Sequence, residues 1–214
     1  MMADTLSLSL WYPNLRQADL AGKLVSVLGS FASHGGDALV YSATVWPVSW
    51  HEAPIFQRLW GRVAPDPENP EQPRGVTAAQ AVAESLELLH EDYAYEFQIA
   101  WHLWELEENA EDGQMRWART PRLVRVIGYG PLFDESAYEA EGHIRIDLGA
   151  DQAFLEEEAN LSEVGSRHVE ENIRQLISLA AAVEKASGAS ARLLWSESGE
   201  SLAERLAARL GVRN

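Results

Sequence analysis

A long β-hairpin over residues 93–129 is the feature of this sequence that most restricts the fold. In its first arm, residues 93–105, the odd positions are apolar, while Glu96, Gln98 and His102 occupy even positions. The odd positions carry Tyr93, Tyr95, Phe97, Ile99, Trp101 and Leu103. A period of two built from aromatic and β-branched residues is typical of a strand with one buried face. We therefore expect this strand to supply a large part of the core.

The second arm, residues 115–129, carries a group of arginines in a chain that is otherwise strongly acidic. These are Arg116, Arg119, Arg122 and Arg125. The turn is expected within residues 107–113, where Asp112-Gly113 is a strong local signal for a hairpin turn. Because proline has no N–H to donate, Pro121 predicts an edge position, a bulge or a break in this arm.

Strand–helix–strand patterns flank the hairpin, at residues 5–47 and again at residues 142–196. In the first pattern, alternating Leu and Ser residues precede a helix that Asn14 is expected to cap. A further helix, opened by the capping-box spacing from Thr77 to Gln80, leads into the hairpin. The sequence therefore predicts an α+β fold. Its mixed sheet has about six strands and about four helices, and two βαβ-like units flank the central helix and the hairpin.

The composition is that of an ordinary globular protein, and 214 residues suit a single domain over residues 1–214. Prolines among acidic residues predict an exposed loop at about residues 62–76. No apolar run approaches the roughly 18 residues of a membrane span, and the alternating N-terminus is typical of a strand, not of a signal peptide. The absence of cysteine excludes disulfides and thiolate metal sites, and it suits a cytoplasmic location.

The net charge of −16 restricts the kinds of partner that the protein binds. Such a surface repels phosphate backbones and anionic lipid headgroups, which disfavours nucleic acid and membranes. It attracts basic proteins or cations, although an excess of acids also keeps a protein soluble without further function. P-loop, dinucleotide-binding, EF-hand and H-E-x-x-H patterns are absent from the sequence, so we expect no cofactor and no metal site.

The polar face of the hairpin is the first candidate site. His102 as a proton carrier, with Arg122 and Arg125 as anion-binding groups, would suit an enzyme acting on a carboxylate or phosphate substrate. The alternative, which we favour, is cross-strand ion pairing of these arginines with Glu96 and its neighbours, because that arrangement needs no ligand.

Two further stretches are candidates. Residues 195–200 join the last predicted strand to the last helix, and Glu197 is a catalytic candidate there, although helix capping is the simpler interpretation. Residues 46–60 carry three tryptophans outside any regular pattern, which indicates either a recognition surface or an aromatic lid on the core.

These observations favour a non-enzymatic protein that binds a basic protein partner, for example an inhibitor or immunity-type protein. Acidic stretches at residues 105–112, 134–141 and 151–171 would supply the attraction. The predicted partner-binding residues are Trp50, His51, Trp60, Trp104, Glu107, Glu108, Glu156 and Glu157. A small-molecule enzyme that uses the hairpin site and a structural homo-oligomer are the alternatives. Exposure of the tryptophans would separate a binding surface from a core.

Overall fold

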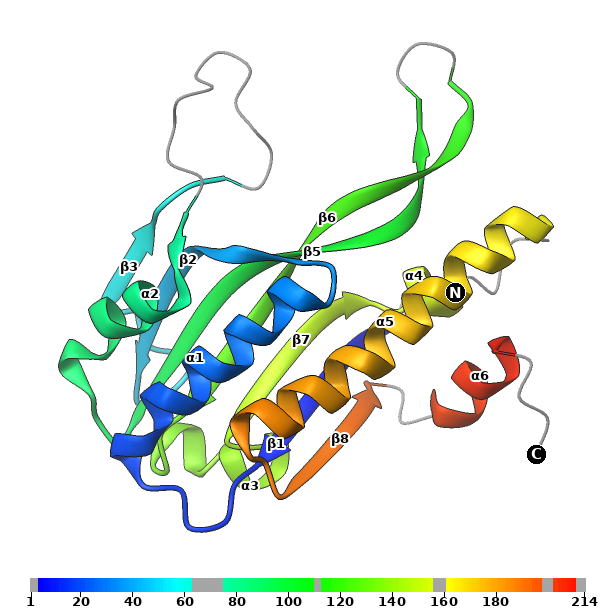
Figure 1. Cartoon of the computed structure of the whole chain (residues 1–214). Helices are drawn as coiled ribbons and strands as arrows, with labels where there is room; N and C mark the ends of the chain where they lie inside the picture. The colour runs from blue at the N-terminus through cyan, green and yellow to red at the C-terminus, as the bar shows by residue number, and fades with distance from the viewer. Residues whose placement is uncertain (1–3, 63–74, 110–112, 156–160, 198–201, 211–214) are drawn as a thin grey trace.

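The computed structural model describes residues 4–62, 75–109, 113–155, 161–197 and 202–210, which form one eight-stranded sheet and six α-helices (Figure 1). The strands are β1 (Thr5–Trp11), β2 (Gly36–Pro47), β3 (Phe56–Leu59), β4 (Val76–Thr77), β5 (Tyr93–Glu108), β6 (Met115–Tyr129), β7 (Ile144–Ala150) and β8 (Ala191–Ser196). The helices are α1 (Leu20–Ser30), α2 (Ala78–Ser85), α3 (Tyr138–Glu141), α4 (Gln152–Leu155), α5 (Glu163–Ser187) and α6 (Leu202–Arg209). The strand order is β3-β2-β5-β6-β7-β1-β8, and β4 pairs with β2 beside β3.

Every strand pairing in the described residues is antiparallel, so the predicted α+β class is confirmed and the predicted mixed sheet is wrong. Counted along the ladders, β1 and β2 point the same way, but β7, β6 and β5 lie between them. In the same way, β7 and β8 share a direction and have β1 between them. The two strands of each strand–helix–strand pattern thus point the same way, as predicted. They are not neighbours in the sheet, because other strands lie between them.

The prediction of about six strands and about four helices missed only short elements. β3 has four residues and lies in the tryptophan-rich segment, where no alternation marked it. β4 has two residues and follows the predicted proline-rich loop, of which residues 63–74 lie outside the described residues. The helices α3 and α4 have four residues each. Elements this short contain too few side chains to produce a periodic pattern.

The hairpin of β5 and β6 forms the middle of the sheet. As its alternation predicted, the odd-numbered side chains of β5 from Tyr95 to Leu103 are at most 1 % exposed. β6 pairs with β5 along its length, but it pairs with β7 only through Arg125–Gly128. Pro121 lies in the part of β6 that has no β7 partner, so its missing N–H leaves no ladder bond unmade on that side. Of the three alternatives predicted for this proline (an edge position, a bulge or a break), the structure shows a local edge position.

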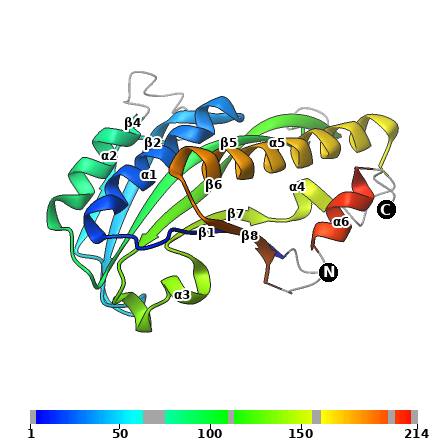
Figure 2. The ribbon, with the colours of Figure 1, turned by 60° about the horizontal axis from the view of Figure 1, so that its bottom comes forward.

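The helices α1, α2 and α5 cover one face of the sheet (Figure 2). The Ser162 side chain caps α5 by accepting from the N–H of Gly165, and Gly188 ends the helix at a φ of 69°. The sequence predicted that Asn14 caps α1, and this is wrong. The helix begins only at Leu20, behind a short 3-10 turn over Gln17–Asp19. Asn14 instead has a φ of 53°, a conformation that asparagine adopts more readily than most residues.

None of the described helices is long and apolar enough to cross a membrane.

The ladder between β2 and β5 reaches only Trp101 of β5. Past that residue, side chains of α5 take the place of a neighbouring strand and bond to the backbone of β5. The Asn172 amide accepts a bond of 2.9 Å from the N–H of Trp104 and donates one of 2.8 Å to the carbonyl of the same residue. Asn172 also donates to the Ala153 carbonyl at 2.8 Å, and Gln175 donates to the His102 carbonyl at 3.1 Å. The helix therefore satisfies an edge that would otherwise be open to another strand.

The opposite face of the sheet has no long helix over it among the described residues (Figure 2). The segment that follows β6, residues 130–142 with α3, packs over one end of this face together with Trp50. We call this side of the sheet the open face. An antiparallel sheet commonly has one face on the core and one toward solvent.

Candidate functional site

The ladders align the side chains of the open face in rows that run across the strands. One row consists of Thr44, Glu96, Ile127, Arg145 and Ser9. The next row consists of Ser42, Gln98, Arg125, Asp147 and Ser7. On the other side of the first row lie Trp46, Ala94 and Tyr129. Acids and arginines from different strands therefore become neighbours in the middle of the sheet.

Asp147 is the centre of an ionic network on the open face, and it is only 6 % exposed. Arg125 donates to its carboxylate at 2.8 Å, Arg145 at 3.2 Å and the Ser7 hydroxyl at 3.2 Å. Arg145 also pairs with Glu141. Both arginines of this network are therefore held by acids of the protein itself.

Tyr129 connects this network to the end of the sheet, because its hydroxyl donates to Glu141 at 2.7 Å. Burial raises the pKa of Tyr129 above its ordinary range, and the positive charge of Arg145 offsets only part of that shift. Burial on its own would lower the pKa of Arg145, but Tyr129, Asp147 and Glu141 outweigh it and raise the pKa. Both groups keep their protons at neutral pH, which suits a structural ion cluster better than acid–base catalysis.

Glu96 differs from the other charged residues of the open face because its side chain has no partner. It is 8 % exposed, yet its carboxylate makes no hydrogen bond or ion pair with any residue that the structure describes. The two nearby arginines, Arg125 and Arg145, are both bound to Asp147. The indole N–H of Trp46, on the adjacent strand, is likewise buried without an acceptor among the described residues. Burying a charge without a partner is costly, so this site is an exception that needs an explanation.

An aromatic cluster lies next to Glu96, under the segment that follows β6. Trp50 is at its centre, and its ring centroid is 5.5 Å from that of Trp46, 6.1 Å from Tyr129 and 5.0 Å from Phe133. All three contacts are edge-to-face, a geometry that stabilises beyond the apolar area that it buries. Trp50 therefore packs inside a small second core and exposes only part of its side chain.

The backbone above the aromatic cluster is strained. Val48 has a φ of 60°, which a β-branched residue rarely adopts, and Asp134, Glu135 and Ser136 have φ angles of 43°, 53° and 68°. The N–H of Asp134 donates to the Val48 carbonyl at 2.7 Å, so the two strained segments are bonded to each other. Such strain costs about 1–3 kcal/mol per residue, persists only where the surrounding structure enforces it, and is concentrated at functional sites.

We call the surface over this cluster the acidic end. It comprises residues 48–52, 91–92 and 132–139, whose backbones are joined by hydrogen bonds of 2.7–2.8 Å. Four glutamates of the acidic end are exposed: Glu52, Glu91, Glu135 and Glu139. None of them makes an ion pair within the described part of the chain. Val48 is 52 % exposed and Leu132 61 % exposed beside them. The acidic end thus combines unpaired negative charge with exposed apolar surface on a constrained backbone.

The structure does not bring together the catalytic candidates of the hairpin. His102 lies on the open face, where its Nε2 is 2.9 Å from a carboxylate oxygen of Asp37. Arg125 lies on the same face, two rows away along the hairpin. Arg122 points to the opposite face and pairs with Glu105. The arginines are thus ion-paired, as the simpler interpretation of the sequence expected, but with acids other than the one it named.

The other predicted site residues are dispersed. Trp60 and Trp104 are half-buried: Trp60 packs against the main core, and the Trp104 ring stacks on His168 with centroids 3.9 Å apart. The exposed ones are His51, Glu107, Glu108 and Glu197. Glu156 and Glu157 lie outside the described residues, as do residues 198–200 of the predicted strand-to-helix turn. Of the predicted partner-binding residues, the acidic end contains Trp50 and His51.

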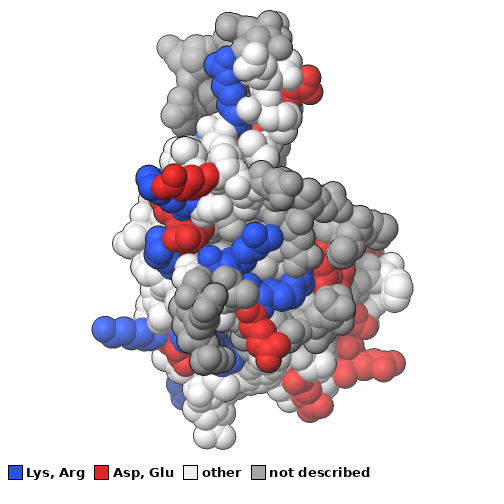
Figure 3. All heavy atoms as spheres, turned by 90° about the vertical axis from the view of Figure 1, so that its right-hand side faces the viewer, with Lys and Arg blue, Asp and Glu red and all other residues white. Residues whose placement is uncertain are grey.

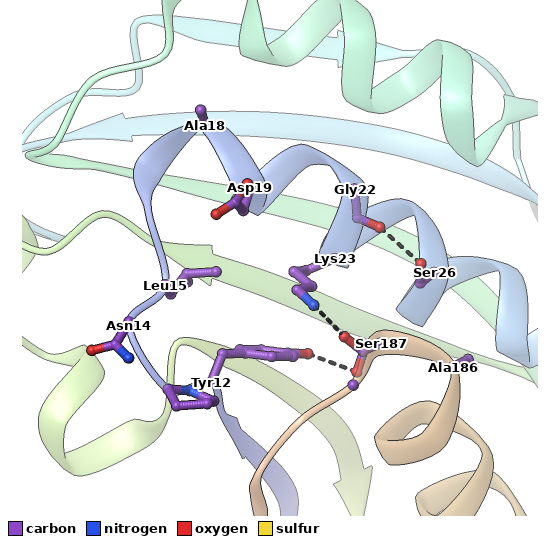
Figure 4. Close-up of a pocket in the computed structure, with 12 residues that line it drawn as sticks. Tyr12, Asn14, Leu15, Ala18, Asp19, Gly22, Lys23, Ser26, Ala186 and Ser187 are labelled. Carbon is purple, nitrogen blue, oxygen red and sulfur yellow. Dashed lines mark hydrogen bonds between the residues drawn. The ribbon is translucent and has the colours of Figure 1, made fainter.

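A groove of about 520 Å³ lies between the start of α1 and the end of α5 (Figure 4). Lys23 reaches across it and donates to the Ser187 carbonyl at 2.7 Å, and the Tyr12 hydroxyl donates to Ser187 Oγ at 2.9 Å. Burial raises the pKa of Tyr12 to about 12, so its hydroxyl stays a donor. A lysine at a helix C-terminus also interacts favourably with the helix dipole. The polar groups of the groove therefore hold the end of α5, and we assign no ligand to it.

Some other parts of the surface carry paired charges. On the face shown in Figure 3, some blue and red side chains lie beside one another. On α5, Arg167 pairs with Glu163 and Arg174 with Glu170, at helical spacing. The segments of the acidic end contain no Lys or Arg.

A scan of protein-family models and searches of curated proteins and of solved structures found no match to this chain. The function is therefore argued from the site alone. In the part of the chain that the structure describes, no group of three or more metal-ligating side chains is placed to hold a metal ion.

Sequence reasoning identified the acidic stretch at residues 134–141 but missed the residues that join it into a site. Val48 and Leu132 gave no signal, because an exposed apolar residue in a loop has no periodicity to reveal it. Glu96 was recognised only as an ion-pair partner. Its one available signal was its even position in β5, which placed it on the polar face of a strand with a strongly buried opposite face.

Proposed function

We propose that this protein binds a basic protein partner through the acidic end and that it acts by binding, not by catalysis. The observation that carries the proposal is a contrast in charge pairing. On the open face, the arginines are held by acids of the same chain, whereas the glutamates of the acidic end have no ion-pair partner in the described residues. A basic partner would supply the missing counter-charges, and electrostatic attraction of this kind speeds association.

The apolar side chains of the acidic end support the same proposal. Val48 and Leu132 are each more than half exposed, and they lie among the acids on a backbone that is held in a strained conformation. Apolar contact area surrounded by polar residues is the usual composition of a protein–protein interface. An inhibitor or immunity-type role, in which the acidic end covers the basic site of a toxin or nuclease, is the most specific form of this proposal. The cytoplasmic location stays the prediction made from the sequence.

A comparison of two variants of equal net charge tests this proposal. In the end variant, Glu52, Glu135 and Glu139 are replaced by Gln. In the control variant, three exposed acids from other parts of the surface are replaced by Gln, namely Glu87, Glu171 and Glu204. Each tagged protein is used to capture partners from a lysate of its native host over a series of salt concentrations, and a captured partner is then purified and its affinity measured by calorimetry.

We expect the wild type and the control variant to retain the same basic protein, with affinity that falls as salt rises. The end variant should bind it about tenfold to a hundredfold more weakly, because each rim charge contributes modestly and three are removed. Equal weakening in both variants would show that only net charge matters and would contradict a site at the acidic end. Capture of no specific basic protein by the wild type at low salt would reject the proposed function.

A further inference from the structure

We infer that Glu96 is the receptor for one arginine side chain of the partner, inserted beside Trp46 at the border of the acidic end. This inference rests on the proposed function and adds to it the position and the chemistry of the anchoring contact. It starts from the carboxylate of Glu96, which the described structure leaves without a partner although the residue is only 8 % exposed.

Glu96 and Trp46 are neighbours on the open face. In the ladder between β2 and β5, Glu96 lies opposite Thr44, and Trp46 lies opposite Ala94. Glu96 and Trp46 are therefore diagonal neighbours, roughly 7–8 Å apart at Cα and within reach of each other's side chains. Ala94 and Trp46 belong to the aromatic cluster, so Glu96 lies where that cluster meets the uncovered part of the open face.

The protein's own arginines do not fill this position. Arg125 and Arg145 are the basic residues nearest to Glu96 in the rows of the open face, and both are bound to Asp147. Arg145 is bound to Glu141 as well. The Glu96 carboxylate is thus the surplus acid of this region, and its remaining 8 % exposure connects it to the surface from which a partner would approach.

A guanidinium group fits this position better than other cations. It is planar, it pairs with a carboxylate through two parallel hydrogen bonds, and it stacks on aromatic rings. Trp46, the diagonal neighbour of Glu96 in the ladder, offers such a ring. An ammonium group is more strongly hydrated and cannot form the same fork, so lysine should be the weaker ligand.

The probe for this inference is N-methylguanidinium chloride, titrated into the full chain with NaCl at matched ionic strength as the reference. The readout is the ¹H–¹⁵N signal of the Trp46 indole, which is assigned by its loss in Trp46→Phe. We expect a saturable shift in the wild type and in Glu139→Gln, an exposed acid of the same end. In Glu96→Gln, binding should be about tenfold to a hundredfold weaker, because a charge-assisted bidentate pair is lost. Methylammonium should bind more weakly than methylguanidinium.

A second variant keeps the test independent of any effect of Glu96→Gln on folding. Thr44→Arg places a guanidinium directly opposite Glu96 in the ladder, so it should fill the site from within and abolish the saturable shift. A shift that is no larger than the NaCl effect would overturn the inference. It would also be overturned if Glu96→Gln or Thr44→Arg bound the probe as the wild type does, or if methylammonium bound as tightly as methylguanidinium.

Capture of the partner separates this inference from the proposed function. If Glu96→Gln binds the captured basic partner as tightly as the wild type, Glu96 is not the anchor, while binding at the acidic end still stands. If methylguanidinium binds at Glu96 as expected but no basic protein is captured, the cation site stands and the proposed function fails.

Discussion

The ionic network around Asp147 and the acidic end beyond Glu96 lie on the same side of one sheet, and both contain carboxylates, but only the network contains arginines. In the network, each charge meets an opposite charge at hydrogen-bond distance, as Asp147 does with Arg125 and Arg145. At the acidic end, the glutamates have no counter-charge in the described residues, and Glu96 lacks one although it is buried. Breaking a buried ion pair from one side lowers the free energy of unfolding, so the paired charges stabilise the fold. A buried charge without a partner lowers the free energy of unfolding, and we interpret Glu96 as a charge kept for binding.

Removal of the central acid of the network should have the largest effect. Asp147→Asn keeps the shape of the side chain but takes the counter-charge from Arg125 and Arg145. Breaking a buried pair from one side costs about 3–5 kcal/mol, so the free energy of unfolding should fall by that order. Urea denaturation followed by circular dichroism measures it. Glu163→Gln, at an exposed pair, is the control and should change the value by less than about 1 kcal/mol. If Asp147→Asn lowered the free energy of unfolding by as little as the control does, the network would not stabilise the fold.

Asn172 extends the comparison to a neutral group that is buried and fully paired. Asn172→Ala removes the amide that bonds the N–H and the carbonyl of Trp104, and leaves them buried at an unpaired edge. Unsatisfied buried polar groups cost about 1–3 kcal/mol, and the free energy of unfolding should fall by this amount. Ser178→Ala, on the exposed side of the same helix, is the matched control. Equal denaturation midpoints for the two variants would contradict the role given to Asn172.

The exposed acids of the acidic end should matter little for folding. Replacing Glu52, Glu135 and Glu139 by Gln in one variant removes charges that have no partner in the described residues. We therefore expect the free energy of unfolding to change by no more than about 0.5 kcal/mol, or to rise slightly as repulsion is relieved. The same denaturation experiment checks it. A loss of more than about 2 kcal/mol would show that these acids stabilise the fold, in which case they would resemble the network.

The smallest effect is a pH dependence that arises between the two regions, at His143. Burial lowers the pKa of His143 below its ordinary value of 6.5, and its Nδ1 accepts from the N–H of Tyr12 at 3.2 Å, which requires the neutral ring. The unfolded chain therefore binds the proton first as pH falls below 6.5, which favours unfolding.

Denaturation at pH values above and below 6.5 measures this effect. The wild type should lose stability toward the lower pH, and His143→Gln should lose less, because its side chain does not titrate. His51→Gln, at an exposed histidine, is the control and should behave as the wild type does. If His143→Gln showed the same pH dependence as the wild type, the neutral ring would not be needed for folding.

Much of the helical side of the molecule was predictable from the sequence, because burial of one face produces a period. The alternation in β5 gave its buried face, and the apolar stripe of α5, with Gly188 after it, gave that helix and its C-terminal end. The order of the strands was not predictable. The pairing of β1 with β7 and β8 depends on contacts between residues far apart in the chain, and local pattern does not contain them.

The candidate site was predictable only in part, for a related reason. The charge of the acidic stretch is visible in composition, but its position over Trp50 follows from long-range packing. The strain at Val48 has no local signal, since nothing in its side chain favours a positive φ. Whether Glu96 is paired depended on which acid the arginines of β6 and β7 would meet, and that was decided by the register of β7.

The sign of the stability change in Glu96→Gln tests the difference between the two regions most directly. If Glu96 is a buried charge kept for a partner, its replacement by the isosteric neutral amide should raise the free energy of unfolding by about 1 kcal/mol, opposite in sign to Asp147→Asn. Urea denaturation of the two variants beside the wild type gives both values. A loss of about 1 kcal/mol or more in Glu96→Gln would contradict this, because it would show that Glu96 stabilises the fold as Asp147 does.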